Sequence, residues 1–342
     1  MYPELFEIPF THVTVKSYGL MMVVGFLSAV YLIRRLSLNI TPNPQLITNA
    51  SLYSLIAGVV GARLFYVVHY FDQFQGRPAS VFAIWQGGLE LLGGFILAVA
   101  VIFFYLRWHK LPIRRYLDIL AIGLMLALTL GRIGCFLNGC CFGKPSELPW
   151  AVRFPYGSPA YRSQIYPNLE RNRHQPQLEL PAEFFGYSDD TGMWHQNLKP
   201  YEQLTEEQKD EVDKGKYRCL PVHPTQLYSS ANAVVLCLIL YFFWRRCQSI
   251  RSKSTGRFKK INKPFAKPGS TFSLMFILYG ITRFFLEFLR EDNPLGFAGL
   301  TVSQRICIIA LVPLGVVLMV IFERMKRDKV TLHDSKQAKV LA

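Results

Sequence analysis

Long blocks of apolar residues, separated by short polar and basic connections, dominate the pattern along this chain. A helix needs about 20 mostly apolar residues to cross the hydrocarbon of a membrane. Because a backbone surrounded by lipid must satisfy its own hydrogen bonds, we expect these blocks to be helices. The pattern predicts an all-α polytopic membrane protein with seven transmembrane helices. Their expected ranges are Tyr18–Leu32, Ile47–Val68, Leu89–Leu106, Tyr116–Leu137, Gln226–Trp244, Phe272–Phe288 and Leu300–Phe322.

The polar segments between these blocks divide the chain into four parts. Residues 1–134 hold the first four predicted helices, and residues 224–323 hold the last three. Residues 135–223 between them are polar and rich in proline and tyrosine, and residues 324–342 form a basic tail. We therefore expect a large loop or head outside the membrane between helices 4 and 5.

Basic residues are concentrated in alternate connections, and this distribution predicts an orientation. The formal net charge is +15, and the excess Lys and Arg residues follow the first, third, fifth and seventh blocks. Cytoplasmic connections carry such an excess, so we expect the N-terminus outside and the C-terminus in the cytoplasm. Attraction to anionic membrane lipid accounts for the basic charge, and no nucleic-acid partner is needed to explain it.

Four arginines lie inside the apolar blocks, and the predicted orientation places all of them in the outer half of the membrane. An ionisable side chain within a span is costly and marks a functional site by default. Arginines at the ends of spans also snorkel to the interface, which remains the alternative for Arg63 and Arg305. Several guanidinium groups at one depth need an anionic partner, and lipid phosphate is abundant there. The four are Arg63, Arg132, Arg283 and Arg305.

The segment Gly131–Pro145 (GRIGCFLNGCCFGKP) carries the strongest local signal. Its glycines permit close approach of a helix or a ligand. Arg132 and Asn138 stand among these glycines, so the segment offers amide donors and a forked cation to one phosphate. Packing of helices along the glycines is the alternative interpretation.

Two further segments place polar side chains at the predicted outer surface. Trp85–Phe95 (WQGGLELLGGF) has two pairs of glycines with Glu90 between them, a pattern that is equally typical of helix packing. His223–Tyr228 (HPTQLY) begins with a proline suited to the first turn of a helix. We expect its His223, Gln226 and Tyr228 side chains to form a polar ring.

In the sixth block, Tyr279, Arg283 and Glu287 are spaced four residues apart and so share one helical face. Glu287 is expected to hold Arg283 in place or to pair with Arg132 across helices. Tyr18, at the start of the first block, supplies a further phenol at the same level.

The seven cysteines show no metal-binding pattern. The adjacent Cys140 and Cys141 are not expected to bind one metal together. A disulfide from either of them to Cys219 is open, because pairing cannot be deduced from sequence.

These motifs together resemble the prolipoprotein diacylglyceryl transferase family. The resemblance extends from SYGL at Ser17–Leu20 through GARLFY at Gly61–Tyr66 and the paired glycines. It continues through Gly131–Pro155, HPTQLY and YGITRFFLEFLRE, and ends near LTVSQ at Leu300–Gln304.

The resemblance implies a defined reaction and location. The diacylglyceryl group of phosphatidylglycerol moves to the lipobox cysteine of a prolipoprotein, a thioether forms, and glycerol phosphate leaves. The family lies in the bacterial cytoplasmic (inner) membrane with seven helices and a site facing outward, and neither metal nor other cofactor is required. Catalytic roles are expected for Arg132, Arg283, Glu287, His223 and Glu90. Contacts to phosphatidylglycerol are expected from Arg132, Tyr18, Arg63, Gly93, Gly94, Asn138, Gly143, Gln226, Tyr228 and Tyr279.

The chain departs from the family's usual pattern at three positions. Leu92 stands where many members have a histidine proposed as a base, Cys135 where asparagine is usual, and Cys140 where an acidic residue is frequent. The general base is therefore open, with Glu90, Glu287, Tyr18 or His223 as candidates. An inactive phospholipid-binding relative, and a transporter or flippase for an anionic lipid, are the alternatives to an enzyme.

Overall fold

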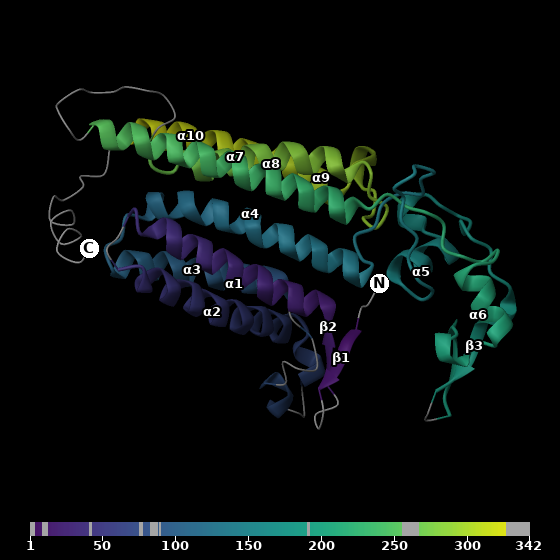
Figure 1. Cartoon of the computed structure of the whole chain (residues 1–342). Coiled ribbons are helices and arrows are strands. Elements are labelled where there is room, and N and C mark those ends of the chain that lie inside the picture. The colour runs from purple at the N-terminus through teal and green to yellow at the C-terminus, as the bar shows by residue number, and fades with distance from the viewer. Residues whose placement is uncertain are drawn as a thin grey trace. The chain divides into compact units, whose positions relative to one another are not determined.

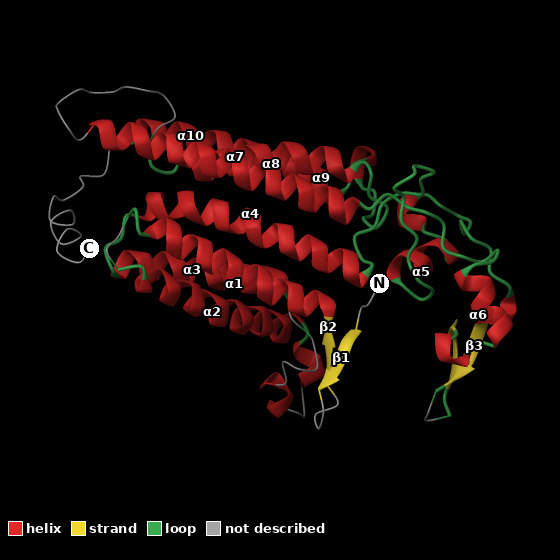
Figure 2. Cartoon of the chain, in the orientation of Figure 1, coloured by secondary structure: helices red, strands yellow, loops and turns green. Residues whose placement is uncertain are grey.

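The computed structural model describes residues 4–8, 13–40, 43–74, 78–82, 88, 90–189, 192–254 and 267–325, and most of them are helical (Figures 1 and 2). The longer helices are α1 (Ser17–Ser37), α2 (Gln45–His69), α3 (Leu91–Trp108), α4 (Ile113–Asn138), α7 (Thr225–Ser254), α8 (Ser270–Glu287) and α10 (Val312–Arg324). Shorter α-helices are α5 (Pro159–Ile165), α6 (Glu206–Asp213) and α9 (Val302–Ile306). Single-turn 3-10 helices are η1 (Phe71–Phe74), η2 (Pro78–Phe82), η4 (Leu169–Arg171), η5 (Ala182–Phe184), η6 (Tyr201–Gln203) and η7 (Phe297–Gly299).

Within the described residues, five helical segments are long and apolar enough to cross a membrane, which supports a multi-pass membrane protein. They are α1, α2, α4, α7 as far as Gln248, and the continuous helical run Val302–Arg324. The two remaining predicted blocks also form helices, α3 and α8, each of 18 residues. The prediction of a polytopic helical protein is therefore confirmed in its coarse form, and the count of seven spans stays a prediction.

Short strands qualify the all-α expectation. An antiparallel hairpin joins β1 (Glu4–Ile8) to β2 (Val13–Lys16), and a second joins β3 (Phe185–Ser188) to β4 (Trp194–Leu198) (Figure 2). Two-stranded hairpins of this length leave no signal among long apolar blocks. The hydropathy pattern therefore does not predict these hairpins.

The chain divides into two compact units. The first contains Met1–Leu27, Leu124–Phe242 and Ser273–Leu318, and the second contains Ser28–Gly123, Phe243–Phe272 and Met319–Ala342. Most of the expected site residues belong to the first unit. Arg63, Glu90, Gly93 and Gly94 belong to the second. The four-part division made from sequence is not tested by this grouping.

In the first unit, α8 and α10 approach closely through glycines. A Cβ atom on Gly280 would lie 2.8 Å from a methyl carbon of Val312, and one on Gly315 would lie 2.9 Å from the Ser273 carbonyl oxygen. Small residues let membrane helices pack backbone to backbone. This packing places α8, which carries Arg283 and Glu287, beside the last helical run.

That last run is one predicted block but contains a change of helical type. The residues Cys307–Leu311 (η8) form a π-helix between α9 and α10. Pro313 lies two residues after this π-helix and has no N–H to donate to the preceding turn. Single π turns inside α-helices are commonly found near functional sites.

In the second unit, a buried carboxylate caps the start of α8. Asp118 of α4 is fully buried and accepts hydrogen bonds from the backbone N–H groups of Gly269 (3.0 Å), Thr271 (2.9 Å) and Phe272 (3.2 Å). The first N–H groups of a helix have no partner within the helix. Asp118 therefore caps α8 from a neighbouring helix, a role that its sequence position inside an apolar block did not reveal.

Replacing Asp118 by alanine should lower the stability of the protein by about 1–3 kcal/mol, because buried backbone donors would lose their acceptor. Thermal unfolding in detergent measures this effect. Asp210→Ala is the matched control, since Asp210 forms an exposed pair with Lys214, and it should change stability by less than about 0.5 kcal/mol. Equal melting temperatures for the two variants would contradict the capping role.

Candidate active site

The loop that follows α4 is held in a fixed, strained shape. Gly139 and Cys141 both have positive φ angles, 74° and 61°. The Cys140 N–H donates to the carbonyl of Cys135 at 3.2 Å, which closes the end of α4. Glycine adopts the left-handed region without cost, whereas a cysteine there is strained and needs support from its surroundings.

The HPTQLY segment supplies that support. The Thr225 hydroxyl donates to the Cys141 carbonyl and the Gln226 amide donates to the Cys140 carbonyl, both at 2.7 Å. Gln226 is fully buried, and its Oε1 has no partner among the described residues. These contacts assign Gln226 to holding the loop, while contact with substrate stays a prediction.

The backbone of His223 also fastens this loop. Its carbonyl accepts from the Gly143 N–H at 3.1 Å. A Cβ atom on Gly143 would lie 2.6 Å from that same carbonyl oxygen, so the close approach requires glycine. The imidazole Nδ1 lies 3.5 Å from the hydroxyl of Tyr228, which in turn accepts from the indole N–H of Trp150 at 2.7 Å. Of the expected polar ring, the structure therefore joins His223 to Tyr228.

A buried ion pair lies on the charged face of α8. The Nη2 atom of Arg283 is 2.7 Å from Oε2 of Glu287, whose side chain is completely buried. Oε1 of the same carboxylate accepts from the Thr301 hydroxyl at 3.1 Å and from the amide of Asn293. Of the two pairings left open by the sequence, the structure shows the one within α8. The carboxylate is thus occupied as an acceptor and fixes the direction of Arg283.

Arg290 joins this pair and was not singled out from the sequence. Its Nε and Nη2 atoms donate to the two oxygens of Asp292 at 2.9 and 2.6 Å, and its Nη1 lies 3.9 Å from Glu287. Burial alone would lower the pKa of Arg290, but the hydrogen bonds and charge of Asp292 raise it above its ordinary value. The guanidinium is therefore a permanent charge. Its signal in the sequence was the charged run LREDN directly after an apolar block.

Two arginines retain donors that no described residue accepts. Nη1 of Arg283 is buried without a partner among the described residues. Arg132, half-buried on α4, has no hydrogen bond or ion pair within the part of the chain that the structure describes. The charges of Arg132 and Arg290 both act on Arg283, so the three lie near one another. Because buried polar groups nearly always have partners, unfilled guanidinium donors point to an anionic ligand.

The other expected residues of this unit lie around these arginines with fewer contacts. Arg305 has a buried Nε without a partner among the described residues. A Cβ on Gly134 would lie 3.4 Å from the ring of Tyr18, which places that phenol beside the end of α4. Asn138 is the last residue of α4, and Tyr279 lies one turn before Arg283 on α8.

In the second unit, Arg63 is fully engaged by a neighbouring loop. Its guanidinium donates to the carbonyl oxygens of Ser80 (2.6 Å), Val81 (2.8 Å) and Gly88 (3.0 Å). Its charge also lies over the ring of Phe74 at 5.4 Å. These contacts support a structural role for Arg63, and its expected contact with lipid phosphate stays a prediction.

The paired glycines of α3 pack against α2. A Cβ on Gly93 would lie 2.5 Å from the carbonyl oxygen of Gly61, and one on Gly94 would lie 2.7 Å from that of Gly58. Both positions are therefore filled by a neighbouring backbone, which supports helix packing, the alternative left open from sequence. Glu90 precedes α3, and its Oε2 lies 3.4 Å from Nδ1 of His69.

The polar segment between α4 and α7 has its own hydrophobic core. Gln164 is buried there, and its Oε1 accepts from the Leu220 N–H at 2.8 Å. The core side chains come from α5, α6, η5, β4 and the loops between them. They are Phe142, Phe154, Ala160, Tyr161, Ile165, Leu178, Phe184, Leu198, Leu204, Val212, Cys219 and Val222.

This segment also grips the chain around Arg290. Arg171 donates to the carbonyls of Arg290 and of Glu291, the latter at 3.0 Å. Arg173 lies 3.6 Å from the Glu291 carboxylate, and the Leu295 N–H donates to the Glu170 carbonyl at 3.0 Å. The segment between α4 and α7 thus holds the backbone at the buried Arg290.

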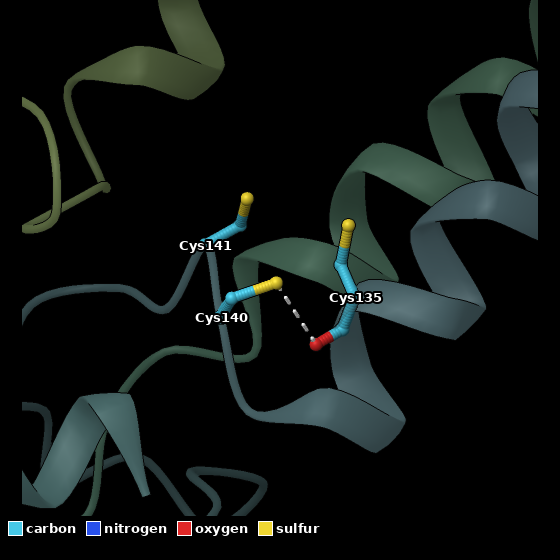
Figure 3. Close-up of side chains that lie close together, drawn as sticks. All are labelled: Cys135, Cys140 and Cys141. Atoms are coloured by element: carbon cyan, nitrogen blue, oxygen red, sulfur yellow. Dashed lines mark hydrogen bonds between the residues drawn. The ribbon is translucent and has the colours of Figure 1, made fainter. Parts of the chain in front are cut away.

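Three cysteines gather at the end of α4 (Figure 3). The sulfur atoms of Cys135, Cys140 and Cys141 all lie within 4.8 Å of one another. Hydrogen bonding with Cys135 and then Cys140 holds the pKa of the Cys141 thiol below its usual range. All seven cysteines are free in the structure, and the Cys219 thiol instead donates to Gln164 inside the loop core at 3.4 Å. The disulfide considered from sequence is therefore not formed.

Comparison with known proteins gives one consistent result. A family model described as prolipoprotein diacylglyceryl transferase matches residues 3–321. A relative from Proteus mirabilis is 31% identical, covering 96% of this chain and 95% of the relative. Relatives from Methylococcus capsulatus (29% identical, covering 91% of this chain and 92% of the relative) and Synechococcus elongatus (26%, 90% and 83%) are also similar. All three carry the name phosphatidylglycerol–prolipoprotein diacylglyceryl transferase. With residues 3–321 matched, this chain belongs to the prolipoprotein diacylglyceryl transferase family.

Proposed function

We propose that this chain is an enzyme that transfers the diacylglyceryl group of phosphatidylglycerol to the lipobox cysteine of prolipoproteins. The names of its relatives support this substrate pair. The observation in the structure that carries the proposal is the group of arginines around Glu287. Arg132, Arg283 and Arg290 outnumber the two carboxylates beside them, Glu287 and Asp292, and leave guanidinium donors unfilled.

The reaction breaks one carbon–oxygen bond and forms one carbon–sulfur bond. The cysteine thiolate attacks the glyceryl carbon, and the electron pair of the breaking bond leaves on the phosphate oxygen of glycerol phosphate. The thiol proton passes to a base. Arg132 and Arg283 bind the phosphate and stabilise the charge that develops on the leaving oxygen. Planar guanidinium groups suit this task because they match two phosphate oxygens at once.

The remaining members of the group act on these two arginines rather than on the lipid. Glu287 holds Arg283 through its 2.7 Å ion pair, and its other oxygen is fixed by Thr301. Because the carboxylate is fully buried, pairs with Arg283 through Oε2 and accepts hydrogen bonds through Oε1, it serves as a positioning residue in this proposal. Arg290 adds a permanent positive charge at the same place.

Purified protein incubated with phosphatidylglycerol and a lipobox peptide should yield a peptide heavier by one diacylglyceryl group. Mass spectrometry detects the thioether, and a peptide with serine in place of the lipobox cysteine is the control. Lipid binding without product would favour the inactive-binder alternative. A transporter or flippase has less support, because transporters place their sites near the midplane between repeats.

For the general base, Glu90 and His223 are the candidates that replace the missing histidine at Leu92. Glu90→Gln or His223→Asn should lower the transfer rate by roughly a hundredfold or more and change its pH dependence, because general-base catalysis contributes about that much. The double variant tests for redundancy. Unaltered rates and pH profiles in all three proteins would exclude both residues as the base.

The proposed location is the bacterial cytoplasmic membrane with the site facing outward. In intact cells or spheroplasts, a membrane-impermeant maleimide should label Asp210→Cys on α6. The same reagent should label His109→Cys, between α3 and α4, only after the membrane is opened. Both residues are exposed in the structure. The unaltered chain corrects for its native thiols, and the reverse labelling pattern would invert the proposed orientation.

A further inference from the structure

The three thiols at the end of α4 form a compact donor set that the proposed transfer reaction does not use. Their sulfur atoms come from two places, the last turns of α4 for Cys135 and the following loop for Cys140 and Cys141 (Figure 3). Each sulfur lies within 4.8 Å of the other two. Three thiolates bound to one ion need to converge in this way, so only small side-chain movements separate this arrangement from a ligand set.

The backbone fixes this convergence. The positive φ of Cys141 directs its side chain differently from that of Cys140, which allows adjacent residues to share one centre. The carbonyls of both residues accept 2.7 Å hydrogen bonds, from Gln226 to Cys140 and from Thr225 to Cys141. A left-handed cysteine persists only where its surroundings determine it. The loop therefore holds two of the three sulfurs without relying on their side chains.

The chemistry of the set selects among ions. Sulfur is a soft ligand and favours Cu(I) and Zn(II), whereas Mg²⁺, Ca²⁺ and Mn²⁺ prefer oxygen. Among the described residues, no histidine or carboxylate donor atom joins the three sulfurs as a fourth ligand. Structural zinc is almost always four-coordinate. A set of three sulfurs alone therefore favours a soft ion that is stable in three-coordination.

The surrounding charge is suited to such a complex. Three thiolates around one monovalent cation carry a net charge of −2. Arg290 and Arg132 both act electrostatically on Cys141 and compensate that charge. A divalent ion would need less compensation, so the two guanidinium groups again favour a monovalent ion.

We propose that Cys135, Cys140 and Cys141 bind one Cu(I) ion in three-coordination. Each thiol still protonated releases its proton on binding, and no electron transfer is involved. The thiols take no part in the proposed transfer reaction, although Arg132 lies near both the thiols and the proposed phosphate site.

Titration of the reduced protein in detergent with Cu(I), against a chromogenic Cu(I) chelator under argon, should show one tightly bound ion per chain. X-ray absorption of the complex should show three sulfur ligands. Cys135→Ser and Cys141→Ser should each weaken Cu(I) binding at least about a hundredfold. Loss of a residue that only hydrogen-bonds to a metal ligand weakens binding by about 10- to 100-fold, and loss of a ligand should cost at least as much.

The matched control keeps the three cysteines and replaces the other four. A chain with Cys219, Cys237, Cys247 and Cys307 all changed to serine should bind Cu(I) as the unaltered chain does. Retained tight binding in Cys135→Ser or Cys141→Ser, or its loss in the four-fold control, would overturn the assignment. Zn(II) bound with a fourth ligand in preference to Cu(I), or a disulfide within the trio in the freshly isolated protein, would also overturn it. These readouts need no transferase activity, so failure of the proposed function would leave the result intact.

Discussion

Replacing Arg132 or Arg283 by alanine should lower diacylglyceryl transfer at least about a hundredfold, because preorganised donors at a developing charge contribute that much to the rate. Arg132 is the cleaner of the two variants, since it has no bond within the described residues that its removal would break. Turnover with phosphatidylglycerol and a lipobox peptide measures the effect. Melting temperature and membrane insertion check that each variant folds.

Lysine at either position should restore only part of the rate, because it keeps the charge but loses the planar fork. Arg305→Ala is the comparison within the same unit and should cost much less. Near-normal turnover in both Arg132→Ala and Arg283→Ala would contradict the proposal that these arginines bind the lipid phosphate. The alternative of an inactive phospholipid-binding protein would then have to be tested again.

Glu287→Ala should be the most destabilising single change in this group, by about 3–5 kcal/mol, because it leaves a buried arginine without its counter-charge. Glu287→Gln keeps the shape and should fold better, yet it should still lose most activity because Arg283 is no longer held by an ion pair. Thermal unfolding and turnover, measured on the same preparations, separate the two effects.

Glu202→Gln, on the exposed 3-10 turn η6, is the matched control and should leave both readouts unchanged. Full activity in a folded Glu287→Gln protein would show that the carboxylate does not position Arg283. If added lipid stabilises the Glu287→Gln protein and also restores its activity, Glu287 contributes to folding alone.

The helices could be predicted from the sequence because lipid imposes a long and simple apolar pattern. Their ends could not, since a helix continues through polar residues once it leaves the apolar block. The block ending at Trp244 thus extends as α7 to Ser254. The change from α-helix to π-helix before Pro313 leaves no trace in the hydropathy pattern.

The site was predictable where chemistry and spacing coincided in one segment. The spacing of Arg283 and Glu287 made their pairing one of two expected ones, and the helix-packing alternative for Gly93 and Gly94 fits the close contacts of α2 and α3. Contacts between distant segments were not predictable. By contrast, the reciprocal cap that Thr301 and Gln304 form at the start of α9 is local, and its T-x-x-Q pattern is visible in the sequence.

Arg290 illustrates the harder case. Its importance depends on Asp292, on Glu287 and on two arginines of a loop more than a hundred residues earlier in the chain. A single sequence shows only a polar residue after a span. Burial of the whole residue, at 4% exposure, is what distinguishes it from an ordinary interfacial arginine.

The grip of Arg171 and Arg173 on Arg290 and Glu291 limits how freely this protein can be re-engineered. The long segment after α4 has its own core and looks transplantable on that ground. Yet its loop at residues 169–173 packs against residues 290–295, and the two segments hold each other in place although they are far apart in the sequence. A chimaera that exchanges the segment with a relative must carry both stretches together, because either one alone would remove these contacts from a buried arginine of the proposed active site.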